Sequence, residues 1–355
     1  MQPTFIFDPE VRNGFAECHG STLAPVAGGW LVAFFAGTCE RHPDTAIWAC
    51  RQSGGKWEKP QVAAKISDEA HWNPVLFKAG GLTRLFFKVG KEIETWETWF
   101  ADYDEAKDGW TEPRRLCSGE DGAGGRGPVR SRPIILANGD WLAPGSHEKV
   151  VGYTFKLAPS GAIYKAPEGI WNAFVDRSPD DGRTWERSEY IPYDRDAWGE
   201  KGGIIQPTLW EQPEGQVNMF IRSTQGCLFR SVSSDNGKTW AEAAPTEVPN
   251  PNSAVDVALL DGKLLVLAYN PVSGNWIRRS PLSLAFSIDC GQTLTEPWNV
   301  IGGTGSFSYP SLYPVPGGVA MTYTWNRRCI CFCRLSVLYK DIVDGVPAMD
   351  VSESG

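Results

Sequence analysis

The chain has 355 residues, 42% of them hydrophobic, and a formal net charge of −8 at neutral pH. This charge argues against nucleic acid as a partner, because phosphate binding needs a basic surface. No apolar run approaches the roughly 18 residues of a membrane-spanning helix, so we expect no membrane partner either.

The N-terminal residues lack the basic start and apolar core of a secretory signal. Without such a signal, the nine cysteines are most simply interpreted as reduced thiols in the cytoplasm. Cys329, Cys331 and Cys333 alternate along a predicted strand and would share one face. A tetrahedral metal site would need a fourth ligand from elsewhere, so we expect core side chains and no metal.

The first predicted strand, at 4–8, is expected to complete the last sheet of the fold. Segment 17–23 then carries His19 ahead of an apolar strand that starts at Trp30. A histidine titrates near neutral pH and can serve as acid or base, although it can also be a turn residue with satisfied hydrogen bonds. Loop 37–44 contains Arg41 and Asp44, which are candidate site residues or part of a solvated loop.

Further polar residues precede the next strands. His71 and Asn73 begin the apolar run 71–77, where His71 is a second candidate base and Asn73 a candidate substrate ligand. Arg132 enters the strand at 134–136, so it is either a substrate ligand or a partner of nearby acids. The stretch 146–172 is rich in Gly, Pro, Lys and Tyr and predicts an extended loop inserted into the fold.

A motif, S-x-D-x-G-x-T-W, recurs at a fixed interval in the second half of the chain. Its aspartates, Asp180, Asp235 and Asp289, stand 55 and 54 residues apart, and Leu294 replaces the last tryptophan. Strand-like runs flank each copy, which indicates a hairpin turn. The aspartate can accept hydrogen bonds from turn amides and the glycine tolerates positive φ, so we interpret the motif as a structural turn and not as an active site.

Partial copies around Trp57 and Trp110, together with a strand-rich segment at 306–340, extend the repeat to six units. Antiparallel sheets repeated around an axis form a β-propeller. We therefore predict an all-β fold, a six-bladed propeller of four-stranded antiparallel blades. It would form one domain over 1–345, with the insertion near 146–172 and a C-terminal tail at 346–355.

The later units hold the strongest candidate site residues. Arg222 lies inside an apolar strand, where arginine is rare unless it is paired or binds an anion; a structural ion pair is the alternative. Gln206 and Arg279 also lie near strand starts. Tyr309 begins the last unit, and Trp325, at the end of a strand in the same unit, is a candidate substrate ligand.

The repeat, its spacing and these residues resemble the Asp-box (BNR-repeat) sialidase superfamily over most of the chain. The resemblance implies that Arg222 and Arg279 hold a substrate carboxylate, as two of the family's three arginines do. It implies that Tyr309, in Tyr-Pro-Ser-Leu, is the nucleophile and that Asp44 is the acid/base.

Two positions depart from the family pattern. His19 stands where the first arginine is expected, and it offers no bidentate fork to a carboxylate. Gln206 stands where a helper glutamate is expected, and an amide cannot take the phenol proton. Glu17, Glu40 and His19 are the candidates for that missing base.

Three functions follow from the sequence. The first is a sialidase-like exo-glycosidase that hydrolyses a terminal carboxylate-bearing sugar, with a tyrosine nucleophile. The second is a uronate lyase with His19 or His71 as base and Tyr309 as acid. The third is a noncatalytic carbohydrate-binding propeller with tryptophan platforms. The sequence contains no phosphate loop, dinucleotide fingerprint or His-x-x-x-His motif, so we expect no cofactor.

Overall fold

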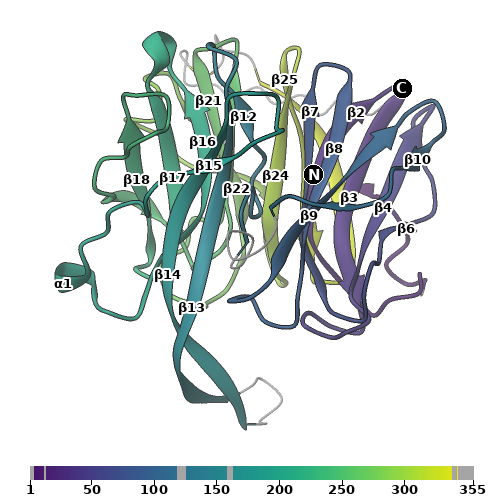
Figure 1. Cartoon of the computed structure of the whole chain (residues 1–355), viewed down its shortest axis with the longest axis horizontal. Coiled ribbons are helices and arrows are strands. Elements are labelled where there is room, and N and C mark those ends of the chain that lie inside the picture. Colours follow the sequence, from purple (N-terminus) through teal and green to yellow (C-terminus); the bar gives the residue numbers. More distant parts are fainter. Residues whose placement is uncertain (1–3, 12, 118–124, 158–162, 338–341, 343–355) are drawn as a thin grey trace.

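The computed structural model describes residues 4–337, except 12, 118–124 and 158–162, together with residue 342. Strands dominate these residues, which confirms the predicted all-β class. Figure 1 shows the sheets standing side by side with one long hairpin extending beyond them. The predicted tail at 346–355 lies outside the described residues. In the described part of the chain, no helix is long and apolar enough to cross a membrane.

Hydrogen bonding groups the strands into five sheets. The first contains β2 (Glu17–Val26), β3 (Gly29–Gly37), β4 (Ala46–Ser53), β5 (Lys56–Trp57) and β6 (Gln61–Ala64). The second contains β7 (His71–Ala79), β8 (Leu82–Val89), β9 (Glu97–Asp104), β10 (Gly109–Trp110) and β11 (Arg114–Arg115). The third contains β12 (Ile134–Ile135), β13 (Trp141–Leu157), β14 (Ile163–Ser178), β15 (Glu186–Arg187), β16 (Gly202–Glu211), β17 (Val217–Ser223), β18 (Cys227–Ser233) and β19 (Ala244–Pro249).

The last two sheets complete the fold. The fourth contains β20 (Asp256–Leu260), β21 (Leu264–Tyr269), β22 (Leu282–Ser287) and β23 (Trp298–Ile301). The fifth contains β24 (Phe307–Val315), β25 (Gly318–Trp325), β26 (Cys329–Ser336) and β1 (Thr4–Phe5). The short helix α1 (Arg195–Trp198) and the 3-10 turn η2 (Pro213–Gly215) lie in the third sheet's connections.

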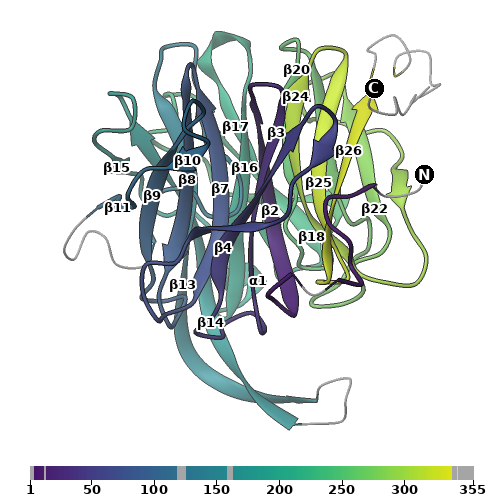
Figure 2. The ribbon, with the colours of Figure 1, turned by 90° about the vertical axis from the view of Figure 1, so that its right-hand side faces the viewer.

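The predicted pairing of the N-terminal strand with the last sheet is confirmed. Thr4 of β1 pairs with Phe332 of β26 in antiparallel register. The fifth sheet also packs against the first, because β24, β25 and β26 all contact β2. Figure 2 shows these strands beside β2 and β3. The two ends of the described chain therefore meet in one region of the molecule.

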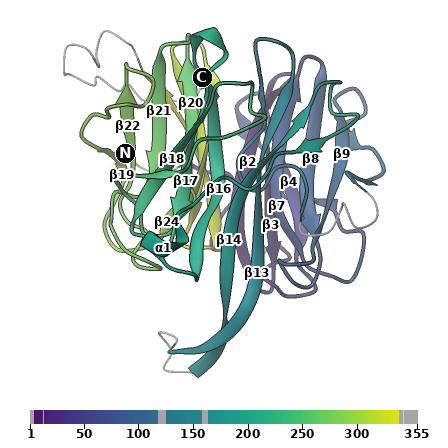
Figure 3. The same ribbon diagram turned by 60° about the vertical axis from the view of Figure 1, so that its left-hand side comes forward.

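The third sheet divides at a short parallel junction. Its strands otherwise pair antiparallel, but β14 pairs with β16 in parallel, through Ile170 with Gly202 and Trp171 with Gly203. Figure 3 shows β14 beside β16, with the lower half of the hairpin β13–β14 projecting below. The strands β12–β15 and β16–β19 are thus two groups joined at one edge.

The loop predicted at 146–172 is wrong for the described residues of this stretch, because 146–157 and 163–172 belong to the long hairpin. β13 and β14 pair from Trp141 with Ser178 outward to Leu157 with Ile163, with one irregularity between Val150 and Gly152. β-branched and aromatic residues such as Val150 and Tyr153 favour a strand. Glycine and proline content concealed this pattern at the sequence level.

The repeated motif forms the structural turn that the sequence predicts. Asp235 Oδ1 accepts from the backbone N–H groups of Lys238 and Thr239 at 3.1 and 2.9 Å, and Oδ2 accepts from the Thr239 hydroxyl at 2.7 Å. Gly237 has φ 79°, which favours glycine. Asp180 and Asp289 make the same set of bonds in their turns.

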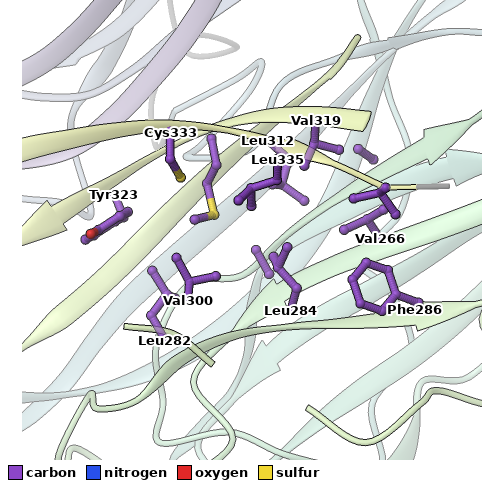
Figure 4. Close-up of a cluster of buried hydrophobic side chains, with 14 of the residues drawn as sticks. Val266, Leu282, Leu284, Phe286, Val300, Leu312, Val319, Tyr323, Cys333 and Leu335 are labelled. Atoms are coloured by element: carbon purple, nitrogen blue, oxygen red, sulfur yellow. The ribbon is translucent and has the colours of Figure 1, made fainter. Parts of the chain in front are cut away.

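Hydrophobic cores fill the spaces between neighbouring sheets. Figure 4 shows one, where Leu284 and Phe286 of the fourth sheet face Leu312 and Leu335 of the fifth. Burying such a side chain contributes roughly 1.5–3 kcal/mol. The prediction that Cys329, Cys331 and Cys333 are core side chains is confirmed, because all three are buried with free thiols.

Candidate functional site

Five strands, one from each sheet, contact one another in the order β7, β2, β24, β20 and β16. Side chains reinforce these contacts: Thr22 Oγ1 of β2 accepts from the Leu76 N–H of β7 at 3.0 Å. Asp256 of β20 accepts from Thr208 of β16 at 2.9 Å and from the Leu312 N–H of β24 at 2.8 Å. Strands that are distant in sequence therefore meet at one centre.

Four of these strands carry a register shift at the same relative position. The shifts lie around Gly20 in β2, Asn73 in β7, Gln206 in β16 and Tyr309 in β24. Each of the four residues is left-handed, with φ of 63°, 42°, 53° and 57° respectively. β-bulges re-aim side chains, and non-glycine residues at positive φ are uncommon and concentrate at functional sites.

Tyr309 lies at the centre of the candidate site. Its side chain is buried, and its hydroxyl accepts from Arg222 Nη1 at 3.0 Å. The ring centroid lies 4.0 Å from that of His19, and the guanidinium groups of Arg279 and Arg130 lie 5.3 Å from it. The phenol is therefore surrounded by positive charge.

Arg222 connects the bulged strands. It is only 2% exposed, and its Nη1 also donates to Gln206 Oε1 at 2.9 Å. Its Nε donates to Asn252 Oδ1 at 2.6 Å. Asn252 has φ 59° and precedes β20, so it resembles the bulge residues in conformation. One guanidinium thus holds Gln206, Asn252 and Tyr309 together.

Two other arginines complete the positive cluster. Arg279 Nη2 donates to the Asn252 carbonyl at 3.1 Å. Arg130 is 1% exposed and donates to the carbonyls of Ser21 and Pro310, which tie β2 to β24 beneath the tyrosine. Arg279 is partly exposed, whereas the buried Arg130 supports the backbone.

Arg327 adds a charge from the turn between β25 and β26. It forms an ion pair with Glu40 at 2.8 Å and lies 3.8 Å from Glu17. It also acts electrostatically on His19 and Tyr309. The two acids suggested as bases by the sequence are therefore neutralised by one arginine.

The charges shift the titration of the central pair. Burial alone would raise the pKa of the Tyr309 phenol, but Arg222 and Arg279 outweigh it and lower this pKa below its usual value. Burial, followed by Arg327 and Arg279, lowers the pKa of His19 well below its usual value. The site therefore favours a neutral imidazole beside a phenol that ionises readily.

Asp44 is exposed and binds its own loop. It accepts from the Thr38 N–H at 3.0 Å and the Thr38 hydroxyl at 2.6 Å, and lies 2.7 Å from His42 Nδ1. Burial would raise the pKa of Asp44, but the Thr38 hydrogen bonds lower it. No contact among the described residues links it to Tyr309, and a carboxyl that ionises so readily is a poor proton donor.

Four other predicted ligands make structural contacts. His71 is buried, bonds to Ile66 N–H and Glu69 O at 3.0 and 2.9 Å, and stacks on Phe87. Arg132 donates to Val257 O at 3.4 Å, and Trp325 packs on Phe5 at 5.1 Å. Arg41 is exposed, lies 3.9 Å from Glu92 and covers the Trp72 ring. Asn73 is the predicted ligand that sits on a bulge.

The structure adds residues that the sequence did not indicate. Trp171 and Trp276 cover Arg222, with its guanidinium 5.5 and 5.3 Å from their rings. Glu148 of β13 lies opposite Trp171. A signal for the bulges was present, because Asn73, Gln206 and Tyr309 each precede a proline. Among the described residues, no group of His, Cys, Asp or Glu is arranged to hold a metal.

Comparisons with known proteins agree with this fold. Anhydrosialidase of Macrobdella decora is 20% identical over 147 residues, which cover 36% of this chain and only 19% of that protein. A protein of unknown function from Dyadobacter fermentans matches with a TM-score of 0.73 and 15% identity, covering 95% of this chain and 98% of the other. Trypanosoma rangeli sialidase matches with a TM-score of 0.64 and 16% identity, covering 90% of this chain and 54% of the other.

The model of the BNR repeat-like domain matches residues 28–321, which include the turns, the bulged strands β7 and β16 and the tyrosine of β24. Since this match covers most of the sequence, the chain belongs to the BNR repeat-like family.

Proposed function

We propose that this protein is a sialidase-like exo-glycosidase that hydrolyses a terminal carboxylate-bearing sugar, such as sialic acid, from an oligosaccharide or glycoconjugate. The observation that carries the proposal is the hydrogen bond from Arg222 to the Tyr309 hydroxyl, with Arg279 5.3 Å from the same ring. A guanidinium pair can hold a carboxylate, and a phenol made acidic by it can act as a nucleophile.

The architecture that we propose with this function is a six-bladed propeller, which forms one domain over residues 1–345. The parallel junction of β14 and β16 supports counting the third sheet as two blades. The contacts among β7, β2, β24, β20 and β16 support arranging the first strands around a common axis. The Trypanosoma rangeli sialidase is a match in fold and has been solved with sialic acid.

In the first step, the Tyr309 phenolate attacks the anomeric carbon while the bond to the leaving oxygen breaks. Arg222 and Arg279 hold the sugar carboxylate, and Arg327 adds a third positive charge near His19. Water then attacks the same carbon and releases Tyr309. Two displacements retain the anomeric configuration.

A uronate lyase is the second candidate, and the packing of His19 against Tyr309, with ring centroids 4.0 Å apart, favours it. His19 Nε2 is buried and has no hydrogen-bond partner among the described residues. As a neutral base it would take the proton from the carbon beside the carboxylate, and the electron pair would form a double bond as the glycosidic C–O bond breaks. Tyr309 would donate its proton to the leaving oxygen.

A single screen separates these functions. The protein is incubated with aryl sialosides, aryl uronides, neutral aryl glycosides and uronate oligosaccharides, and products are followed by NMR and ultraviolet absorbance. Release of a free sugar acid with retained configuration supports the hydrolase. A new absorbance from an unsaturated uronate identifies a lyase, and binding without turnover identifies a carbohydrate-binding module.

The compartment that fits this proposal is the cytoplasm. Cys18, Cys50 and Cys329 lie in one hydrophobic core, yet all three are free thiols. Unlinked neighbouring thiols are typical of a reducing environment.

A further inference from the structure

We infer that Glu148, on the long hairpin β13–β14, is the proton-transferring carboxyl of this site. This inference rests on the proposed glycosidase function and names the residue that donates a proton to the leaving oxygen. Gln206 cannot supply a proton-transferring group, because its amide neither gains nor loses a proton near neutral pH. The carboxyl would come instead from the inserted hairpin.

Strand alternation places Glu148 on the face of β13 that meets the site. Ser146, two residues earlier, is buried and accepts from the Gln206 N–H at 2.6 Å. His147, between them, points to the other face, where it bonds the Tyr190 hydroxyl at 2.7 Å. Because residues i and i+2 of a strand share a face, Glu148 lies about 7 Å beyond Ser146 on the Gln206 side.

The partner strand β14 independently places Glu148 on the same face. Glu148 pairs with Trp171 across the hairpin, and directly opposed residues have their side chains on one face. The Trp171 ring lies 5.5 Å from the Arg222 guanidinium and 6.3 Å from the Trp276 ring. Glu148 is therefore on the wall of the site that also carries Trp171.

The other acids near the site are occupied. Asp44 is bound by Thr38, and Glu40 forms the ion pair with Arg327 at 2.8 Å. Glu17 lies 3.8 Å from the same arginine. No ion pair of Glu148 is found in the part of the chain that the structure describes, so its carboxyl is available to a substrate.

The surroundings of Glu148 suit a proton donor. Burial raises the pKa of Glu148, and Glu40 raises it further, whereas Arg222 and Arg41 partly offset the increase. These are the charged groups that face it from β17 and from the loop after β3. A raised pKa favours the protonated carboxyl, which is the form that an acid in glycoside cleavage requires.

The reaction balances with these residues alone. Arg222 and Arg279 favour loss of the Tyr309 proton to solvent before cleavage. The phenolate oxygen then bonds to the anomeric carbon, and Glu148 gives its proton to the departing oxygen. Afterwards the Glu148 carboxylate takes a proton from water, whose oxygen bonds to the anomeric carbon as the bond to Tyr309 breaks.

The test compares leaving groups. The variant Glu148→Gln is assayed on an umbelliferyl sialoside, whose leaving group needs little protonation, and on a sialyl disaccharide, whose leaving group needs a proton. We expect the disaccharide rate to fall by roughly 10²–10⁴-fold and the umbelliferyl rate by less than about tenfold. The decline of kcat/KM at alkaline pH, which reports ionisation of the acid, should vanish in the variant.

Glu168→Gln is the matched control, because Glu168 lies on β14 of the same hairpin and pairs with Lys201 at 2.6 Å. It should behave as the wild type on both substrates, and Glu148→Asp should recover part of the disaccharide rate. Equal losses on both substrates, or a retained alkaline decline, would overturn the role of Glu148 while leaving the glycosidase intact. A wild-type protein that cleaves none of the sugars would overturn the proposed function and this inference together.

Discussion

The repeated turns and the bulged strands β2, β7, β16 and β24 both contain left-handed residues, but these residues serve different purposes. In the turns, Asp181, Asn236 and Cys290 have φ near 60°, and each is followed by a left-handed glycine. At the bulges, Gln206 and Tyr309 have φ of 53° and 57°. The three turns have nearly the same sequence, whereas the four bulged segments share only a proline that follows three of the left-handed residues.

The difference lies in where the polar side chains find partners. Each turn aspartate accepts hydrogen bonds from amides and a hydroxyl within its own turn. The turn therefore depends on a few adjacent residues of the motif. The bulge side chains meet partners from other strands, as Gln206 and Tyr309 meet Arg222. A regular motif thus marks the scaffold, and the irregular positions of the same fold bring together the side chains of the candidate site.

The largest expected effect comes from a substitution at the bulge of β24. Tyr309→Phe should lower kcat by at least roughly 10³-fold, because it removes the oxygen proposed as the nucleophile and keeps the ring against His19. Steady-state kinetics on the substrate found in the screen would measure it. Tyr313→Phe, in the same strand but against Arg132, is the control. Near-normal turnover by Tyr309→Phe would contradict a role of the bulged residues in the reaction.

The second-largest expected effect concerns Arg222, which joins the bulged strands. Arg222→Lys should lower kcat/KM roughly 10²-fold, because lysine cannot bind Gln206, Asn252 and Tyr309 together while holding a carboxylate. Binding of the sugar acid by calorimetry should weaken in parallel. Arg230→Lys, whose guanidinium bonds Asn218 at 2.7 Å, should leave both unchanged. If the two variants behave alike, the arginine is only structural.

The turns should respond in stability and not in activity. Asp235→Ala leaves the amides of Lys238 and Thr239 without their acceptor, which should cost about 1–3 kcal/mol of unfolding free energy. Urea denaturation would measure this loss. The folded variant should keep the wild-type kcat/KM, and a specific loss of turnover would contradict the division between scaffold and site.

The smallest effect is a pH dependence of stability. Hydrogen bonds from the N–H and hydroxyl of Thr184 lower the pKa of Asp180 from 3.8 to about 2. Burial would raise the pKa of Asp235, but the Thr239 hydrogen bonds lower it to about 2. A depressed folded pKa stabilises the protein above the unfolded value, so this contribution should be lost as pH falls from about 4 to about 2.

Urea unfolding at a series of pH values would detect this loss. In Asp235→Asn, stability should decline less steeply with acid over the same window. An unchanged slope would mean that the turn carboxylates do not bind protons differently in the folded and unfolded chain.

Local patterns explain what the sequence predicted well. The turns depend on a few adjacent residues, so their structure and the all-β class followed directly from the motif. The resemblance implied that Arg222, Arg279 and Tyr309 belong to one site, and the structure brings them together with His19 and Gln206.

Other features depend on contacts that composition does not encode. Glycine and proline in 146–172 suggested a loop, which hid the hairpin and therefore Glu148. The left-handed backbone of Asn252 and Arg130 has no periodic signal, so the sequence did not predict it. The position of Asp44 in the chain matched the family pattern, but its loop supplies nearer hydrogen-bond donors.

The pairing of β1 with β26 has a consequence for how the chain folds. The thiol of Cys329 donates to the carbonyl of Phe7, 322 residues away in sequence. At a synthesis rate of about 5–20 residues per second, the N-terminal strand would wait on the order of tens of seconds for its partner. The last sheet should therefore assemble late, and slowly, because contacts between such distant segments must first overcome the entropy of closing a long loop.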